Sequence, residues 1–347
     1  MPESSTAVTP QRLFSLMMGF KGTAVLRTAI DLGIFDAVDA LTAGGTGAAD
    51  AAAVASRLGT DPRATRLLLN ALAGLGLLSA DPTGHRLAPG AADLLVSTGP
   101  RYSGGISRVA SSYGEWEALG RLTTTVRSGE PVPGVDATAP DFGYWVDFAV
   151  NTTFATEKGA ALIAETLAPW LDGRPAPRVL DAGAGSGAFG LRLAQDRPEA
   201  EIHLQDWAAV LDVAAGKAKT RGLLDQVSLL PGDVLSTALD GPYDVVVAGN
   251  LLFLYSPERA QALLERLAAA LKPDGRLVVI SFMTGEDPVR DEHAHLLNLL
   301  MLSWTGSAEI LSPQAYREMA EAAGLSETEL HERPGLPLRV LVARRPA

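Results

Sequence analysis

The chain has 347 residues, more than one domain usually contains, and its net charge of −11 gives an acidic surface that repels the phosphate backbone of nucleic acids. It has no cysteine, which excludes disulfides, thiolate nucleophiles and cysteine-ligated metals. The first ten residues lack the basic and apolar parts of a signal peptide, and no apolar run reaches the ~18 residues that a bilayer span needs. We therefore expect a cytoplasmic protein of at least two domains that binds neither nucleic acid nor membrane.

The N-terminal segment is predicted to form a long apolar helix. Apolar residues recur at helical spacing from Leu13 to Ile30, and the pattern continues to about Leu41. The apolar face is too wide for a surface helix of a monomer. We therefore expect an obligate homodimer that forms through this part of the chain.

The plan of a winged helix follows from the next segments. Residues 48–58 are predicted to form a second helix and residues 62–78 a third, which begins with Asp61 as N-cap and Pro62 in the first helical position. Residues 79–89 resemble a short hairpin with a Pro-Thr-Gly turn. Helices followed by a hairpin indicate a winged-helix-like domain, which we assign to residues 1–100.

Residues 101–172 are rich in aromatic side chains and are read as a helical connector that forms one wall of a substrate pocket. An ordinary interdomain core is the alternative. The aromatic residues are Tyr102, Tyr113, Trp116, Phe142, Tyr144, Trp145, Phe148 and Phe154. Among them, Tyr113 and Trp116 are candidate substrate contacts.

Residues 173–347 alternate between short apolar strands and amphipathic helices, which predicts a parallel sheet covered on both faces. The expected strands are residues 178–182, 200–206, 227–233, 243–250 and 275–282, and the expected intervening helices are 189–196, 208–222 and 257–272. A helix over 312–324 and strands over 327–334 and 338–345 complete the chain. The last two strands are expected to form a hairpin on the sheet edge.

A glycine-rich loop follows the first of these strands. Gly183, Gly185 and Gly187 let the backbone turn tightly and let a ligand approach closely. Asp206 ends the next strand, at the distance expected of a carboxylate that accepts the ribose hydroxyls of a nucleotide. The pattern predicts a nucleotide cofactor at the carboxyl ends of the strands.

The glycine spacing also fits a dinucleotide such as NAD(P), or a loop without any ligand. Three features favour S-adenosylmethionine (SAM). Asp181 directly precedes the glycines, and Asp233 follows the third strand, where the adenine amine needs an acceptor. The chain also ends in a helix and hairpin rather than in a second mononucleotide-binding half.

Nearly the whole chain resembles the dimeric class I SAM-dependent O-methyltransferases of small molecules, of the caffeate, hydroxyneurosporene and acetylserotonin type, found in secondary metabolism. The resemblance is carried by the opening helix, the segment LLNALAGLGLL with its hairpin, and the motifs VLDAGAGSG, LQDW, PGDV, GNLLFLYSPE and AALKPDGRLVVISF. It implies an α/β fold with a C-terminal Rossmann-like methyltransferase domain and an N-terminal α-helical winged-helix domain for dimerisation rather than DNA binding.

The resemblance also implies roles for single residues. Gly183 and Gly185 would approach the methionine part of SAM, and Asp206 would hold the ribose. Around the adenine, Trp207 and Val234 would pack against the ring and Asp233 would accept from the amine. Asn250 would lie near the carboxylate or sulfonium end.

One departure from the family concerns the catalytic base. Many members have a His-Asp-Trp segment after the fourth strand, and its histidine deprotonates the substrate hydroxyl. Here Phe253, Leu254 and Tyr255 occupy these positions, and Ser281 stands where an acidic residue often follows the fifth strand. Phe253 is therefore assigned to the substrate pocket, and the usual base is absent.

Three explanations stay open: an acceptor that ionises unaided, another residue as the base, or a changed chemistry. His295 is the best alternative base, because it shares a helical face with Asn298, a second candidate pocket residue. The competing interpretation is a histidine that is exposed at the surface or hydrogen-bonded within the protein, without a catalytic role. His293 and His295 diverge on a helix, so no metal site is expected.

The leading hypothesis is methyl transfer to an oxygen of a small natural-product intermediate. Transfer to carbon or nitrogen is the alternative within the same class. A SAM-binding relative that no longer methylates is a second class, motivated by Phe253. A transcriptional regulator is a third, although its presumed recognition helix offers only Arg63 and Arg66.

Overall fold

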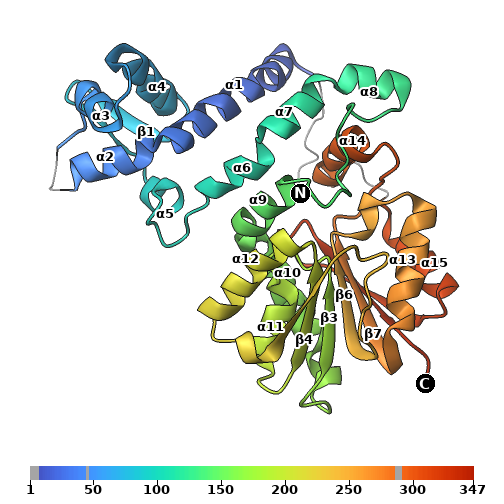
Figure 1. Cartoon of the computed structure of the whole chain (residues 1–347). Coiled ribbons are helices and arrows are strands. Elements are labelled where there is room, and N and C mark those ends of the chain that lie inside the picture. The colour runs from blue at the N-terminus through green and yellow to red at the C-terminus, as the bar shows by residue number, and fades with distance from the viewer. Residues whose placement is uncertain (1–7, 44–46, 286–290) are drawn as a thin grey trace. The chain divides into compact units, whose positions relative to one another are not determined.

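The computed structural model of the chain describes residues 8–43, 47–285 and 291–347 (Figure 1). The chain divides into two compact units, Met1–Ser112 and Tyr113–Ala347.

The first unit consists of helices and one antiparallel hairpin, as predicted for a winged helix. Its elements are α1 (Pro10–Leu32), α2 (Ile34–Thr42), α3 (Ala51–Leu58), α4 (Pro62–Gly74), β1 (Leu78–Asp81), β2 (Gly84–Leu87), α5 (Ala91–Leu95), η1 (Gly104–Ile106) and α6 (Ser107–Ala110). Residues such as Phe35, Leu69 and Leu72 are fully buried between these helices and form the core of the unit.

Three helix boundaries in this unit differ from the sequence-based prediction. The second predicted helix begins at Ala51 rather than at residue 48, because Asp50 is its N-cap and Ala49 pairs with His85. The first helix does not continue to Leu41, because Gly33 adopts a left-handed conformation with φ 71° and its N–H donates to the carbonyls of Ala29 and Ile30. The third helix ends at Gly74 rather than at Leu78, which begins β1 instead. Its predicted start is confirmed, because the Asp61 side chain accepts from the Ala64 N–H at 2.7 Å.

Helix α1 exposes large apolar side chains in the described part of the chain, among them Leu16 and Met17 at 70% and Phe20 at 62%. By length and mean hydropathy alone, α1 is long and apolar enough to cross a membrane, although sequence inspection found no such run. Averaging over the helix offsets its charged residues Arg12, Lys21, Arg27 and Asp31, which interrupt the apolar runs. The exposure of these side chains indicates a surface that another apolar surface covers.

The second unit begins with four helices that precede its sheet. They are α7 (Tyr113–Gly120), α8 (Leu122–Ser128), α9 (Tyr144–Asn151) and α10 (Thr153–Leu171). The sheet has seven strands in the order β5-β4-β3-β6-β7-β9-β8. Their bounds are β3 (Arg178–Ala182), β4 (Glu201–Asp206), β5 (Val227–Pro231), β6 (Tyr243–Gly249), β7 (Leu271–Ser281), β8 (Ser326–His331) and β9 (Arg339–Arg344).

The sheet confirms the predicted topology. Strands β3 to β7 are parallel, and β9 pairs antiparallel with both β7 and β8, as expected for a terminal hairpin on the sheet edge. Strand β7 is longer than predicted: it begins at Leu271, which pairs with Tyr243, so the preceding helix ends at Ala269.

Helices cover both faces of this sheet (Figure 1). The remaining elements are α11 (Ala188–Asp196), α12 (Ala208–Thr220), η2 (Leu224–Gln226), η3 (Leu252–Leu254), α13 (Pro257–Ala269), α14 (Glu292–Thr305) and α15 (Pro313–Ala322). Alternate strand residues divide between two cores: Val179 packs with residues of α10, α11 and α12, and Leu180 packs with residues of α13, α14 and α15.

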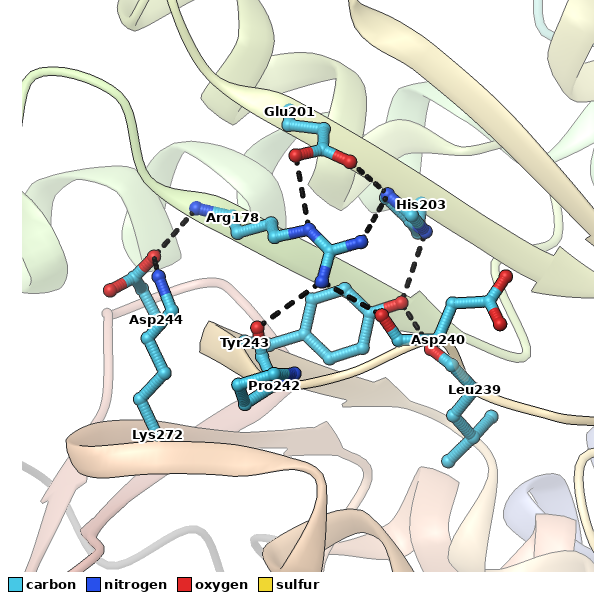
Figure 2. A network of polar contacts seen from close by, with 9 residues as sticks. All are labelled: Arg178, Glu201, His203, Leu239, Asp240, Pro242, Tyr243, Asp244 and Lys272. Carbon is cyan, nitrogen blue, oxygen red and sulfur yellow. Dashed lines mark hydrogen bonds and ion pairs between the residues drawn. The ribbon is translucent and has the colours of Figure 1, made fainter.

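Polar side chains join the amino ends of the central strands, where Arg178, Glu201 and Tyr243 begin β3, β4 and β6 (Figure 2). Glu201 accepts from Arg178 Nε at 3.0 Å and lies 2.6 Å from His203 Nε2. The Tyr243 hydroxyl donates to the Leu239 carbonyl and lies 3.0 Å from His203 Nδ1. This network holds the strands at the edge opposite to their carboxyl ends.

Candidate functional site

A cavity opens at the carboxyl ends of the parallel strands, where open α/β sheets bind ligands. Its floor is formed by the loop after β3, the end of β4, the turn after β5 and the segment after β6. Side chains from α9 and α14 form its walls. The parallel order of the strands therefore brings segments more than 100 residues apart to one site.

The glycine loop after β3 has the backbone that its sequence predicts. Gly183, Gly185 and Gly187 have φ values of 63°, 54° and 72°, a conformation that L-residues other than glycine rarely adopt. A Cβ at Gly183 would lie 2.9 Å from Leu251 Cδ1, whereas a Cβ at Gly185 would meet no atom within 4 Å. Gly185 therefore presents bare backbone to open space in the cavity.

Asp206 at the end of β4 fixes this loop and also faces the cavity. Its Oδ2 accepts from the Gly185 N–H at 2.8 Å and its Oδ1 from the Trp207 N–H at 2.7 Å. Burial raises the pKa of the carboxyl, and these two hydrogen bonds oppose the rise. Each carboxylate oxygen keeps a further lone pair, so the pair of oxygens can still accept two ribose hydroxyls.

The two other predicted carboxylates are not among the residues that line the cavity. Asp181 is fully buried, and its Oδ2 accepts from the Gly190 N–H at 2.9 Å, which ties β3 to α11. Asp233 Oδ1 accepts from the Leu235 N–H at 2.9 Å and shapes the turn after β5. Its neighbour Val234 lines the cavity and is buried, so this turn does contribute an apolar contact.

Asn250 supplies an unsatisfied acceptor to the cavity. It follows β6 with φ 50°, and its N–H donates to the Ile280 carbonyl at 2.8 Å. Its Oδ1 is buried and has no hydrogen-bond partner among the described residues. Because a buried acceptor without a partner costs free energy, this oxygen fits a donor on a bound ligand such as an ammonium group.

Most of the remaining lining is aromatic and apolar, apart from threonines such as Thr138 and Thr152. Tyr144, Trp145 and Phe148 on α9 form one cluster, in which the rings of Tyr144 and Trp145 lie 5.2 Å apart and cross edge to face. Phe253 faces the same cavity from η3, and the further apolar residues are Phe282, Leu297 and Met301. One end of the cavity is therefore polar with exposed backbone, and the other suits a planar apolar molecule.

Four predicted pocket or catalytic residues lie outside this cavity lining. Tyr113 is 75% exposed at the start of α7, and Trp116 lies one turn further along that helix. Asn298 accepts from the Ile310 N–H at 2.6 Å and so holds α14 to the segment before α15. His295 lies on α14, and its buried Nε2 has no hydrogen-bond partner among the described residues. The residues of α14 that line the cavity are Leu297 and Met301.

Comparisons with known proteins agree with this arrangement. An O-methyltransferase domain matches residues 148–326, and an O-methyltransferase dimerisation domain matches residues 14–97. The chain belongs to the O-methyltransferase family. It uses SAM as its cofactor, and residues 14–97 give it the dimerisation domain of a homodimer.

Similar proteins cover almost the whole chain. A 3-hydroxy-5-methyl-1-naphthoate 3-O-methyltransferase of Streptomyces sahachiroi is 27% identical over 92% of this chain and 90% of its own. The acetylserotonin O-methyltransferase of Mus musculus is 29% identical over 96% and 88%. A crystal structure of a putative O-methyltransferase from Nostoc punctiforme superposes with a TM-score of 0.86 at 26% identity, over 98% and 100% of the two chains.

The structure of PigF with S-adenosylhomocysteine (SAH) superposes with a TM-score of 0.83 at 26% identity, over 97% of this chain and all of the other. The residues around the methyltransferase cavity fit such a cofactor. Bare backbone at Gly185, two spare lone pairs on Asp206 and the unsatisfied Oδ1 of Asn250 are complementary to a nucleoside that carries an amino acid.

The glycine loop and Asp206, which the sequence pattern indicated, line the cavity, whereas part of the aromatic wall was not predicted. From the sequence, Tyr144, Trp145 and Phe148 were noted only as connector aromatics, and Tyr113 and Trp116 were chosen from the same segment instead. The spacing of Tyr144 and Phe148, four residues apart on a short amphipathic helix, was an available signal for a shared face. Nothing in the sequence distinguished the Leu297 and Met301 face of α14 from that of His295.

Proposed function

We propose that this methyltransferase transfers the methyl group of SAM to a hydroxyl oxygen of a small aromatic natural-product intermediate. The observation that carries the proposal is the joining, in one cavity, of cofactor-binding backbone with an aromatic and apolar wall. Relatives named for a naphthoate, for mitomycin and for tetracenomycin support this class of acceptor. The family membership favours oxygen over a carbon or nitrogen acceptor and over a non-methylating relative.

In this proposal the polar end of the cavity holds the cofactor. Gly183 and Gly185 approach its methionine part, Asp206 holds the ribose, and Asn250 Oδ1 accepts from the ammonium group. Trp207 and Val234 pack on the adenine. Asp233 accepts from the adenine amine, and its hydrogen bond from the Leu235 N–H shapes the turn after β5. Asp181 supports the glycine loop through its hydrogen bond from the Gly190 N–H.

The aromatic end orients the acceptor and excludes water. The bound cofactor supplies an electrophilic methyl group on a sulfonium, so the chain itself has to position the acceptor oxygen and receive its proton. Phe253 packs against the acceptor and cannot receive a proton. His295 stays a candidate base, although its ring lies outside the cavity lining.

We further propose that the enzyme is cytoplasmic and binds neither nucleic acid, membrane nor metal. The net charge of −11 supports the absence of nucleic-acid binding, because an acidic surface repels the phosphate backbone. Burial of α1 against a second copy of the chain accounts for its apolar surface without a membrane.

Incubation with methyl-labelled SAM and a panel of phenols, naphthols and hydroxyquinones tests the proposed acceptor class. We expect a labelled methyl ether and SAH in equal amounts. Label on carbon or nitrogen of the product, or SAM binding without any transfer across the panel, would contradict the proposal.

A further inference from the structure

A carboxyl group lies directly behind the aromatic wall of the cavity. Glu115 is on α7 and is only 9% exposed, and its Oε1 accepts from the Tyr144 hydroxyl at 3.1 Å. Tyr144 itself lines the cavity. A hydrogen bond therefore connects the acceptor end of the cavity with a buried carboxylate 29 residues earlier in the chain.

Among the described residues that line the cavity, the titratable side chains are Tyr144, Asp206 and Tyr255. Asp206 already accepts a hydrogen bond from the Gly185 N–H of the glycine loop. Burial raises the pKa of Tyr255 to about 12, and this residue follows η3 rather than lying on α9, which carries the aromatic wall. Tyr144 is thus the titratable group of the aromatic wall, and it is bonded to a group that can take up a proton.

We propose that Tyr144 and Glu115 form the proton acceptor that replaces the histidine base absent at Phe253. Tyr144 is the catalytic residue, because its hydroxyl oxygen accepts a hydrogen bond from the hydroxyl group of the substrate. Glu115 is a positioning residue that acts through Tyr144. The inference rests on the proposed O-methyl transfer. It assigns the proton of the acceptor to a side-chain pair that neither composition nor spacing indicated.

The step balances without any further reactant. The acceptor's O–H bond breaks and its proton bonds to Tyr144 Oη, while the former Tyr144 proton passes to Glu115 Oε1. The acceptor oxygen keeps the electron pair of that bond and forms its new bond to the methyl carbon, and the electron pair of the former carbon–sulfur bond stays on sulfur. Glu115 ends the cycle protonated and loses that proton to solvent.

The surroundings of Glu115 suit this exchange. Burial raises its pKa to about 7, against a smaller lowering by the Tyr144 hydrogen bond, so a carboxyl group titrates where a general base is most effective. Helix α7 packs against α8 and α14, whose titratable or charged residues are Arg127, Glu292, His293 and His295. Helix α9 packs against α12, where Lys217 Nζ donates to the Ala149 carbonyl.

The test compares Glu115→Gln, Tyr144→Phe and the double variant with wild-type enzyme, and uses Glu117→Gln as control. Glu117 lies on the same helix, is exposed and pairs with Arg121 at 3.1 Å. With the acceptor identified by the labelled-SAM panel, we expect kcat/KM of the wild type and the control to fall below a pH of about 7. Glu115→Gln should lose this acidic limb and about 100-fold in kcat, with SAH affinity unchanged.

The double variant should be no slower than either single variant, because the two residues act as one unit. The loss in Glu115→Gln should shrink along a series of increasingly acidic phenols, since an acceptor that is already ionised needs no base. Glu115→Gln with the wild-type pH profile, or additive losses in the double variant, would overturn the relay while leaving O-methyl transfer intact.

A second measurement does not depend on turnover. Difference infrared spectra of the SAH complex, wild type minus Glu115→Gln, should show the carbonyl stretch of a protonated carboxyl that disappears as pH rises through about 7. Tyr144→Phe should shift this transition to higher pH, since it removes the hydrogen bond that favours the carboxylate. A carboxyl that is ionised throughout the range from pH 5 to 9 would also overturn the proposal.

Discussion

Asp181 has no solvent exposure, and only its Oδ2 has a hydrogen-bond partner among the described residues. Burial raises its pKa from 3.8 to about 7, opposed by the Gly190 N–H and helped by the nearby charge of Asp206. The sequence motif placed this carboxylate beside the cofactor. In the structure the carboxyl supports the loop through its hydrogen bond from the Gly190 N–H, and burying it has an electrostatic cost that depends on pH.

Asp181→Asn should remove that pH dependence and keep the hydrogen bond from Gly190. A raised folded-state pKa gives stability that is fully present below the unfolded-state pKa of about 3.9 and is lost as pH rises through about 7. Relative to Asp181→Asn, the wild type should therefore lose about 4 kcal/mol of unfolding free energy between pH 4 and 8. Urea denaturation at several pH values measures this difference, and parallel stability curves would refute it.

At the scale of elements, α14 depends on a buried ion pair near its first turn. Arg339 of β9 donates from Nη2 to Asp291 Oδ1 at 2.6 Å and from Nη1 to the Met283 carbonyl at 2.8 Å, and its Nε lies 2.7 Å from Glu332. The side chains of Arg339 and Asp291 are 9% and 8% exposed. The pair therefore anchors the helix that carries Leu297 and Met301 to the end of the sheet.

Arg339→Met should lower the unfolding free energy by about 3–5 kcal/mol, because it leaves the Asp291 carboxylate buried without its cation. Arg344→Met is the control, since this arginine at the other end of the same strand pairs with Glu327 at 2.7 Å and with Asp274 at 2.8 Å, and its side chain is 32% exposed. It should cost about 1 kcal/mol or less. Equal losses for the two variants in urea denaturation would show that the buried pair has no special role.

The elements that sequence predicted best are those with local signals. Asp61-Pro62 set the start of α4, and short apolar runs between amphipathic helices set the five parallel strands. Errors arose where one glycine decided a boundary: Gly33 divides the predicted first helix, and Gly76, with φ 74°, precedes β1. A local pattern does not reveal which glycine adopts the left-handed conformation, because tertiary packing makes that choice.

The candidate site divides in the same way. The glycine loop and Asp206 follow from a short motif and a fixed spacing, so their place at the carboxyl ends of the strands was predictable from the sequence. The Glu115–Tyr144 hydrogen bond and the Leu297 face of α14 depend on how helices far apart in the chain pack together. No periodicity within one helix reports such a contact.

At the scale of the whole molecule, the apolar surface of α1 and the match of residues 14–97 to a dimerisation domain concern the same segment. Leu16 and Phe20 are four residues apart and therefore lie on one face of the helix. We propose that this face lies in the dimer interface, where large apolar side chains contribute most of the binding free energy.

The double variant Leu16→Glu and Phe20→Glu should weaken dimerisation on the order of 100-fold, because two carboxylates would have to be desolvated on association. Leu224→Glu serves as the control, since this apolar residue is 49% exposed but lies outside the dimerisation domain. Light scattering over a range of protein concentrations measures the change. An unchanged dimer in the α1 variant would place the interface elsewhere.

The central claim is that the bare backbone at Gly185 and the carboxylate of Asp206 hold the cofactor of an O-methyltransferase. Gly185→Ala adds one methyl group to the cavity, in a left-handed conformation with φ 54° and without contact to other protein atoms. Gly222→Ala imposes the same strain at φ 70°, also without contacts, at a position outside the cavity lining. The free energy of unfolding should therefore fall by a similar amount in the two variants, about 1 kcal/mol each.

Calorimetric titration with SAH separates the cofactor site from this strain. We expect the wild type to bind one SAH per chain. In Gly185→Ala the dissociation constant of SAH should rise at least about tenfold, because the added methyl group prevents the cofactor from approaching the backbone closely. Gly222→Ala should bind SAH as the wild type does. Absence of SAH binding by the wild type, or equal binding by both variants, would contradict the account.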